Sequence, residues 1–111
     1  MPIIPNSSVN INTDQVVDQA VPINKTLAVV NTAEDLVLVP ATKKGRQFSL
    51  VNEGPGSAFI QVDGTATLLS TEVKVKDTWY ETALSISTRL SFIGETGKQP
   101  HVRGVLWAGP A

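Results

Sequence analysis

The sequence predicts an all-β fold, a sandwich of two packed antiparallel sheets that follows an extended N-terminal arm. Short runs of alternating apolar and polar residues recur about every 8 to 12 residues, turn residues close each run, and helical periodicity is nearly absent. The chain has 111 residues, which is the size of one domain with one core. We therefore expect an arm over 1–20 and a single sandwich domain over 21–111.

The first 20 residues differ in composition from the rest. They combine prolines and a polar Asn/Ser stretch with apolar side chains that follow neither a strand period nor a sustained helical one, among them Ile3, Ile4, Val9 and Ile11. Only 12–20 carries a helical signal, one or two turns with Asn12 or Thr13 as N-cap. Two interpretations stay open: a frayed terminus, or an arm that orders on a neighbouring subunit.

From residue 21 onward the chain reads as short strands separated by turns. The expected strands are 26–31, 36–40, 48–52, 58–62, 72–76, 78–81, 84–87, 90–94 and 101–107. Pro40 ends the second strand because it has no N–H for a ladder. Gly54-Pro55-Gly56 is expected to close a hairpin, and Asp63-Gly64 to form a tight turn.

Alternation predicts which side chains are buried. Phe48 and Leu50 share a face and point to the core, whereas Phe59 points away from the core in its strand. Trp79 and Tyr80 are neighbours in a strand, so they point to opposite faces, and we expect one of them to face outward.

The residues for catalysis or metal binding are scarce. The chain has no cysteine, which excludes disulfides, zinc knuckles and thiol catalysis, and its single histidine, His101, has no sequence partners for a triad or a metal site. The acidic residues are spread over turns and strand edges, and no phosphate-binding glycine motif occurs. We therefore predict a protein that is not an enzyme, with no catalytic residue, no metal and no cofactor.

Charge and hydropathy limit the partners. The net charge is −1 and only 17% of the residues are charged, against about 25% in typical soluble domains. We expect no specific nucleic-acid binding and, because no apolar run approaches about 20 residues, no membrane span. The start of the chain lacks the pattern of a cleaved signal peptide. A surface this poor in charge favours a chain that works inside an assembly.

Two groups of side chains are candidate contacts. Lys43, Lys44 and Arg46 form the densest positive cluster, which is either a solvated strand end or a rim contact with an acidic neighbour. The aromatic candidates are Phe59, Trp79 and Tyr80. Core packing is one role for such rings; an outward Trp or Tyr suits a protein hot spot or a sugar-stacking surface.

The stretch RQFSLVN (46–52), followed by a glycine-rich turn, the strand AFIQV (58–62) and the segment 84–97, resembles small structural proteins of bacteriophages. Over roughly 43–107 the chain is similar to head decoration proteins, of the cement or staple kind found on short-tailed phages such as epsilon-fifteen. The resemblance implies a jelly-roll-like sandwich on the outer surface of the capsid. Such a protein is made in the host cytoplasm and carried on the virion.

The resemblance also implies a partner and a role. The partner is the major capsid (coat) protein, whose neighbouring subunits the chain would clamp so that the DNA-filled head resists internal pressure. The apolar residues of the arm, the cationic cluster and the aromatic candidates are the expected coat contacts. A homodimer, a carbohydrate-binding module and a tail or connector protein stay open as alternatives.

Overall fold

The structure is a computed structural model that describes residues 17–37, 39–40, 42–82 and 89–110. Eight strands form over these residues, and no helix does. They are β1 (Gln19–Thr26), β2 (Glu34–Val37), β3 (Lys43–Asn52), β4 (Ala58–Val62), β5 (Thr71–Val73), β6 (Thr78–Glu81), β7 (Arg89–Gly94) and β8 (His101–Pro110). Nothing in these ranges is therefore a helix that could cross a membrane.

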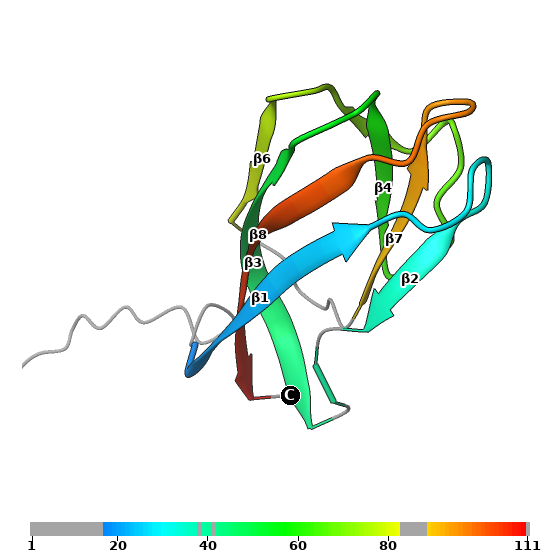
Figure 1. The fold of residues 1–111 in the computed structure, drawn as a ribbon. Helices are drawn as coiled ribbons and strands as arrows, with labels where there is room; N and C mark the ends of the chain where they lie inside the picture. The colour runs from blue at the N-terminus through cyan, green and yellow to red at the C-terminus, as the bar shows by residue number, and fades with distance from the viewer. Residues whose placement is uncertain (1–16, 38, 41, 83–88, 111) are drawn as a thin grey trace, which may run out of the picture.

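The strands form two antiparallel four-stranded sheets, ordered β1-β8-β3-β6 and β2-β7-β4-β5, which face each other (Figure 1). Strand 1 pairs with 8, 2 with 7, 3 with 6 and 4 with 5, as in one long hairpin, and the pairs β3·β8 and β4·β7 arise when that hairpin is rolled up. This is the strand order of a jelly roll. The predicted all-β sandwich of two antiparallel sheets is confirmed.

Side chains from both sheets fill the space between them. Phe48 and Leu50 on β3 are fully buried, as the alternation predicts, and they face Ile60 on β4 and Phe92 on β7 in one apolar core. Because side chains alternate along a strand, the residues next to these core residues point to the outer face of their sheet. Each sheet therefore has one dry face and one outer face available for contacts.

The antiparallel order divides the connections between two ends of the sandwich. The far end holds the loops 27–33, 53–57, 74–77 and 95–100. The terminal end holds the start of β1, the end of β8, the ends of β2, β4 and β6, and the starts of β3 and β7.

Several predicted strand limits are wrong, and side-chain hydrogen bonds explain the largest error. The run 26–31 was expected as a strand, but β1 ends at Thr26 and a loop follows. The Glu34 carboxylate accepts the N–H groups of Ala28 and Val29, and Gln99 donates to the carbonyls of Leu27 and Ala28, so this backbone bonds to side chains instead of a neighbouring strand. The strand expected at 84–87 lies outside the described residues.

The first strand, β1, contains a proline, a residue that has no N–H for a ladder hydrogen bond. Pro22 lies in β1, opposite Val105 of β8. β1 is an edge strand with β8 as its one partner, and an edge strand tolerates a residue without an N–H. The strand also begins at Gln19, so the last two residues of the expected arm and of the possible helix 12–20 belong to the sheet.

Three turn predictions need correction. Gly54-Pro55-Gly56 closes no hairpin, because β3 and β4 lie in different sheets and this segment carries the chain between them. Asp63-Gly64 begins an eight-residue connection, 63–70, instead of a two-residue turn. The strand expected over 72–76 ends at Val73, because Asp77 N–H donates to Lys74 O and closes a turn.

Candidate docking surfaces

The predicted contact residues do not form one site. Trp79 points inward, where its ring meets the Phe48 ring edge-on, so it packs against the core. Tyr80 points outward from the β1-β8-β3-β6 sheet, with 59% of its surface exposed. Phe59 lies half-buried on the outer face of the other sheet, opposite Ile93 of β7. The prediction that Trp79 and Tyr80 face opposite ways is confirmed.

The cationic cluster holds the chain ends together at the terminal end. The Lys43 ammonium lies 2.7 Å from the Asp18 carboxylate, just before β1. Arg46 donates through Nη2 to the carbonyl of Pro110 at the end of β8, at 2.6 Å. Lys44 pairs in the ladder with Gly109 and takes part in no ion pair within the described residues. Lys43 and Arg46 therefore have structural partners within the chain.

The arm candidates Ile3, Ile4, Val9 and Ile11 lie outside the described residues. The chain becomes described at Val17, whose side chain is exposed, and Asp18 N–H donates to Ala108 O of β8. The arm is therefore joined to the sandwich at the terminal end, beside Lys43.

His101 belongs to a polar chain on the outer face of the β1-β8-β3-β6 sheet. Its Nδ1 lies 3.1 Å from Glu53 Oε1, and its Nε2 lies 2.6 Å from Asn24 Oδ1. Arg103 reaches the second oxygen of Glu53 at 3.6 Å. Among the described residues no group of three or more His, Cys, Asp or Glu side chains is placed to hold a metal ion.

An open groove of about 370 Å³ lies beside this polar chain. Its lining consists of Pro22, Ile23, Asn24, Val51, Glu53, Arg103 and Gly104. Tyr80 lies on the same outer face as Pro22, with two strands between them, in one row of the sheet: Pro22, Val105, Ser49, Tyr80. The groove is open to solvent and combines apolar and polar contact surface for a ligand or partner.

An exposed apolar pair that was not predicted from the sequence lies in the connection 63–70, here called the leucine loop. Leu69 is 96% exposed, and Leu68 beside it is 51% exposed. Ala66 N–H donates to Ser91 Oγ, and Ser70 Oγ donates to Gln61 Oε1. Ser91 and Gln61 both point outward, so the loop lies on the outer face of the β2-β7-β4-β5 sheet.

A signal for the leucine loop exists in the sequence. Leu68 and Leu69 are adjacent apolar residues inside a run of Gly, Thr and Ser between two strands, where a loop would ordinarily carry polar residues. An apolar pair at such a position indicates contact with something other than the chain's own core.

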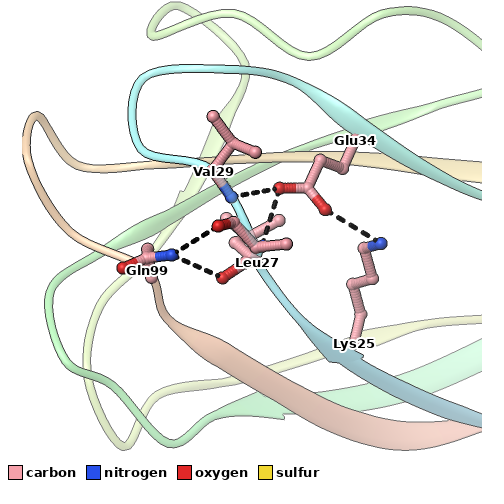
Figure 2. Close-up of polar contacts among 6 residues, drawn as sticks. Lys25, Leu27, Val29, Glu34 and Gln99 are labelled. Carbon is pink, nitrogen blue, oxygen red and sulfur yellow. Dashed lines mark hydrogen bonds and ion pairs between the residues drawn. The ribbon is translucent and has the colours of Figure 1, made fainter.

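A second exposed apolar pair lies at the far end, in the loop 27–33, here called the valine loop. Val29 is 53% exposed, and Val30 beside it is exposed as well. Figure 2 shows how the Glu34 carboxylate and the Gln99 amide hold the backbone from both sides. Gly97 N–H also donates to Asn31 Oδ1, which joins the valine loop to 95–100.

Glu34 is held in its charged form. Burial raises its pKa, but the N–H of Val29, the Lys25 ammonium at 3.1 Å and the N–H of Ala28 together lower the pKa below its ordinary value. The valine loop therefore rests on a partly buried carboxylate that carries a charge at neutral pH.

Comparison with known proteins adds no relative. No family model, curated protein or solved structure matches the chain. The site must therefore be argued from its own geometry. That geometry consists of two ordered loops with exposed apolar pairs, the leucine loop on the outer face of one sheet and the valine loop at the far end, and an arm that joins the sandwich at the terminal end.

Proposed function

We propose that this protein is a structural component of a virion, which binds the outer surface of a phage capsid and clamps neighbouring major coat subunits. The observation that carries the proposal is the presence of two separate exposed apolar pairs on one small sandwich, Leu68-Leu69 over the outer face of the β2-β7-β4-β5 sheet and Val29-Val30 in a loop at the far end. A clamp needs two separate contact surfaces on a rigid body. The jelly roll supplies the rigid body.

The way the charges are used supports a mainly apolar contact. Lys25, Lys43 and Arg89 are each paired with an acidic side chain of the same chain, at 3.1, 2.7 and 2.7 Å. These cations already have partners, so attachment through them alone would first break internal pairs. Burial of apolar side chains and backbone hydrogen bonds from an arm would not require any of these ion pairs to break.

A clamp of this kind stabilises a shell by mass action. The chain would bind assembled coat subunits and not separated ones, so each occupied site shifts the equilibrium toward the intact shell. When one of the two loops is bound, the other loop is held near its own binding site at a high effective concentration, about millimolar for short connections. Two weak contacts on a rigid sandwich can in this way act as one strong contact.

The proposal is tested by isolating the chain from its source with an affinity tag and identifying by mass spectrometry the proteins that co-purify in stoichiometric amount. Recovery of a major coat protein, together with loss of heat resistance in heads that lack this chain, is the expected result. Recovery of a tail component, or retention of the chain on a polysaccharide with no protein partner, would overturn the proposal. The first outcome favours a tail protein, and the second favours a carbohydrate-binding module that uses the groove beside Tyr80.

A further inference from the structure

We infer that Leu68 and Leu69 are the main anchor of the proposed attachment, and that they enter an apolar pocket on the surface of a coat subunit. This inference rests on the proposed function and names the surface that performs it. It does not follow from the resemblance discussed above, since the leucine loop lies in a region to which that resemblance assigns no role.

The exposure of the two side chains is the first argument. Leu69 is 96% exposed, so its side chain touches almost nothing in its own chain, and Leu68 is 51% exposed. Single exposed leucines are common on protein surfaces, but two adjacent ones at the crest of one loop form a small apolar projection. Such a projection contributes nothing to the core of this sandwich, and it gains free energy only when a partner covers it.

The order of the loop is the second argument. Thr67 N–H donates to Ser70 Oγ, Ser70 N–H donates to Thr67 O, and Leu69 N–H donates to Thr67 Oγ1. Ala66, which is buried, fixes the base of the loop through Ser91. The two leucines are thus presented in one conformation before binding. A preorganised loop loses little conformational entropy when a partner covers it, which is the arrangement that gives a small contact high affinity.

The charges around the loop favour a protein pocket over an anionic membrane. The residues 63–70 include one acid, Asp63, and no base. The nearest strand cation in the ladder, Arg89, is paired with Asp35 at 2.7 Å. Binding to an anionic lipid surface relies on Lys and Arg beside the apolar residues. The leucine loop lacks them, so we assign it to an apolar pocket of a protein.

The position of the loop is the third argument. The leucine loop follows β4 from the terminal end, where β1 also begins, and lies over the outer face of the β2-β7-β4-β5 sheet, where Ser91 and Gln61 hold it. The projection and the residue that joins the arm, Asp18, therefore belong to one rigid body, and a coat subunit bound at the leucines keeps the arm close to the shell. Binding through a rigid projection and a linked arm multiplies the affinity of each.

The test measures attachment of labelled protein to heads that lack it, by co-sedimentation over a range of protein concentrations. Leu69→Ser removes most of the apolar projection, whereas Leu69→Met keeps it apolar. Thr65→Ala changes an exposed residue of the same loop that has no hydrogen bond in the structure. We expect Leu69→Ser to weaken attachment about thirtyfold or more, as for an interface hot spot, and the other two variants to stay within about threefold of the parent protein. The circular dichroism spectrum should not change in any variant, because Leu69 makes no core contact.

Each other outcome has one meaning. If the parent protein attaches and Leu69→Ser attaches equally well, the leucines are not the anchor, and the proposed function stands without them. If the parent protein does not attach to the heads at all, the proposed function fails and the anchor fails with it. If Leu69→Ser instead converts a self-associated parent protein into a monomer in sedimentation velocity, the pocket belongs to a second copy of this chain, and the assignment to the coat is overturned.

Discussion

The ring of Trp79 lies edge-on against the ring of Phe48, with centroids 4.9 Å apart and planes at 83°. This pair joins β6, an edge strand, to the core, while Tyr80, the next residue, points into solvent. Trp79→Ala should lower the free energy of unfolding by about 3 kcal/mol, because it removes an aromatic contact and leaves a cavity beside Phe48. Urea unfolding followed by circular dichroism measures this change.

Tyr80→Ala is the matched control, in the same strand and of similar size. Its hydroxyl reaches only Gln47 Oε1, at 3.5 Å, so we expect a change within about 0.5 kcal/mol. Equal losses for the two variants would contradict the assignment of Trp79 to the core and Tyr80 to the surface.

Asn52 connects the two sheets at the far end. Its side chain is fully buried, its Nδ2 donates to the carbonyls of Gly56 and Val73, and its Oδ1 accepts the N–H of Gly54. Asn52→Ala leaves these three backbone groups without partners, so we expect a loss of about 2–4 kcal/mol in the free energy of unfolding. Thermal unfolding by calorimetry is a suitable measurement.

Asn24→Ala serves as the control for an exposed amide, since its Oδ1 bonds only to His101. We expect it to cost less than about 1 kcal/mol. A small loss in the free energy of unfolding for Asn52→Ala would show that water replaces the amide, and that the far end is more accessible to solvent than in the structure.

Glu34 makes stability depend on pH. Its pKa in the folded chain is below the ordinary value of 4.5, mainly because the N–H of Val29 and the Lys25 ammonium outweigh the opposing effect of burial. The carboxylate therefore stabilises the fold above that ordinary value, and the stabilisation is lost as the pH falls through the lowered pKa. Glu34→Gln should reduce the free energy of unfolding by about 1 kcal/mol at about pH 7.

The difference between the parent protein and Glu34→Gln should shrink as the pH falls through the lowered pKa of Glu34, because protonation makes its side chain neutral like that of glutamine. Urea unfolding at several pH values measures it. Asp35→Asn removes a neighbouring carboxylate from an exposed ion pair with Arg89, and we expect less than about 1 kcal/mol from it. A difference for Glu34→Gln that stays constant over this pH range would mean that its charge does not support the valine loop.

Gly104 allows β8 to approach β3 closely. A Cβ atom at this position would lie 2.6 Å from Leu50 Cα, a backbone atom that cannot move without displacing the strand. Gly104→Ala should therefore lower the free energy of unfolding by about 3 kcal/mol. Gly97→Ala is a control with open space around it and a φ of +78°, for which we expect about 1 kcal/mol. Similar losses in urea unfolding would show that strand contact at Gly104 is not the cause.

The fold class was predictable because alternation is a local property. The strands 58–62 and 78–81 were predicted with their observed limits, and Phe48, Leu50 and Ile60 reach the core as their spacing requires. The connections between strands were harder to predict, because they depend on which sheet each strand joins. Gly54-Pro55-Gly56 has the composition of a hairpin turn, and only the assignment of β3 and β4 to different sheets shows that it is a crossover.

The candidate site was harder to predict, because it depends on contacts between residues far apart in the chain. Val29 belongs to a run with strong strand propensity, and it lies in a loop because Glu34 accepts its N–H and Gln99 donates to the carbonyl of Ala28 before it. Lys43 and Arg46 were predicted from local charge as contacts, but Asp18 and Pro110 reach them from the chain ends. Leu68 and Leu69 are an adjacent apolar pair in a loop, and patterns that identify strands and turns do not search for such pairs.

The arm is tested by a deletion that stops before the sheet. β1 begins at Gln19, and Asp18 bonds both to Lys43 and to Ala108, so removing 1–20 would damage the fold as well as the arm. Removing 1–16 spares these contacts. We expect this deletion to leave the circular dichroism spectrum and the urea midpoint unchanged and to weaken co-sedimentation with heads at least about tenfold, because linked binding through the arm is lost.

The chemistry of the arm is tested separately with the full-length chain. Ile3→Ser, Ile4→Ser and Ile11→Ser combined keep the length and backbone of the arm but remove apolar side chains, whereas Ser7→Ala and Ser8→Ala combined change polar positions of the same arm. Attachment lost in the first variant and retained in the second would assign the contact to apolar side chains. Retention in both, together with loss on deletion, would assign it to backbone pairing with a coat strand, because strand addition depends on main-chain hydrogen bonds. Full attachment after deletion of 1–16 would remove the arm from the proposed clamp and leave attachment to the loops.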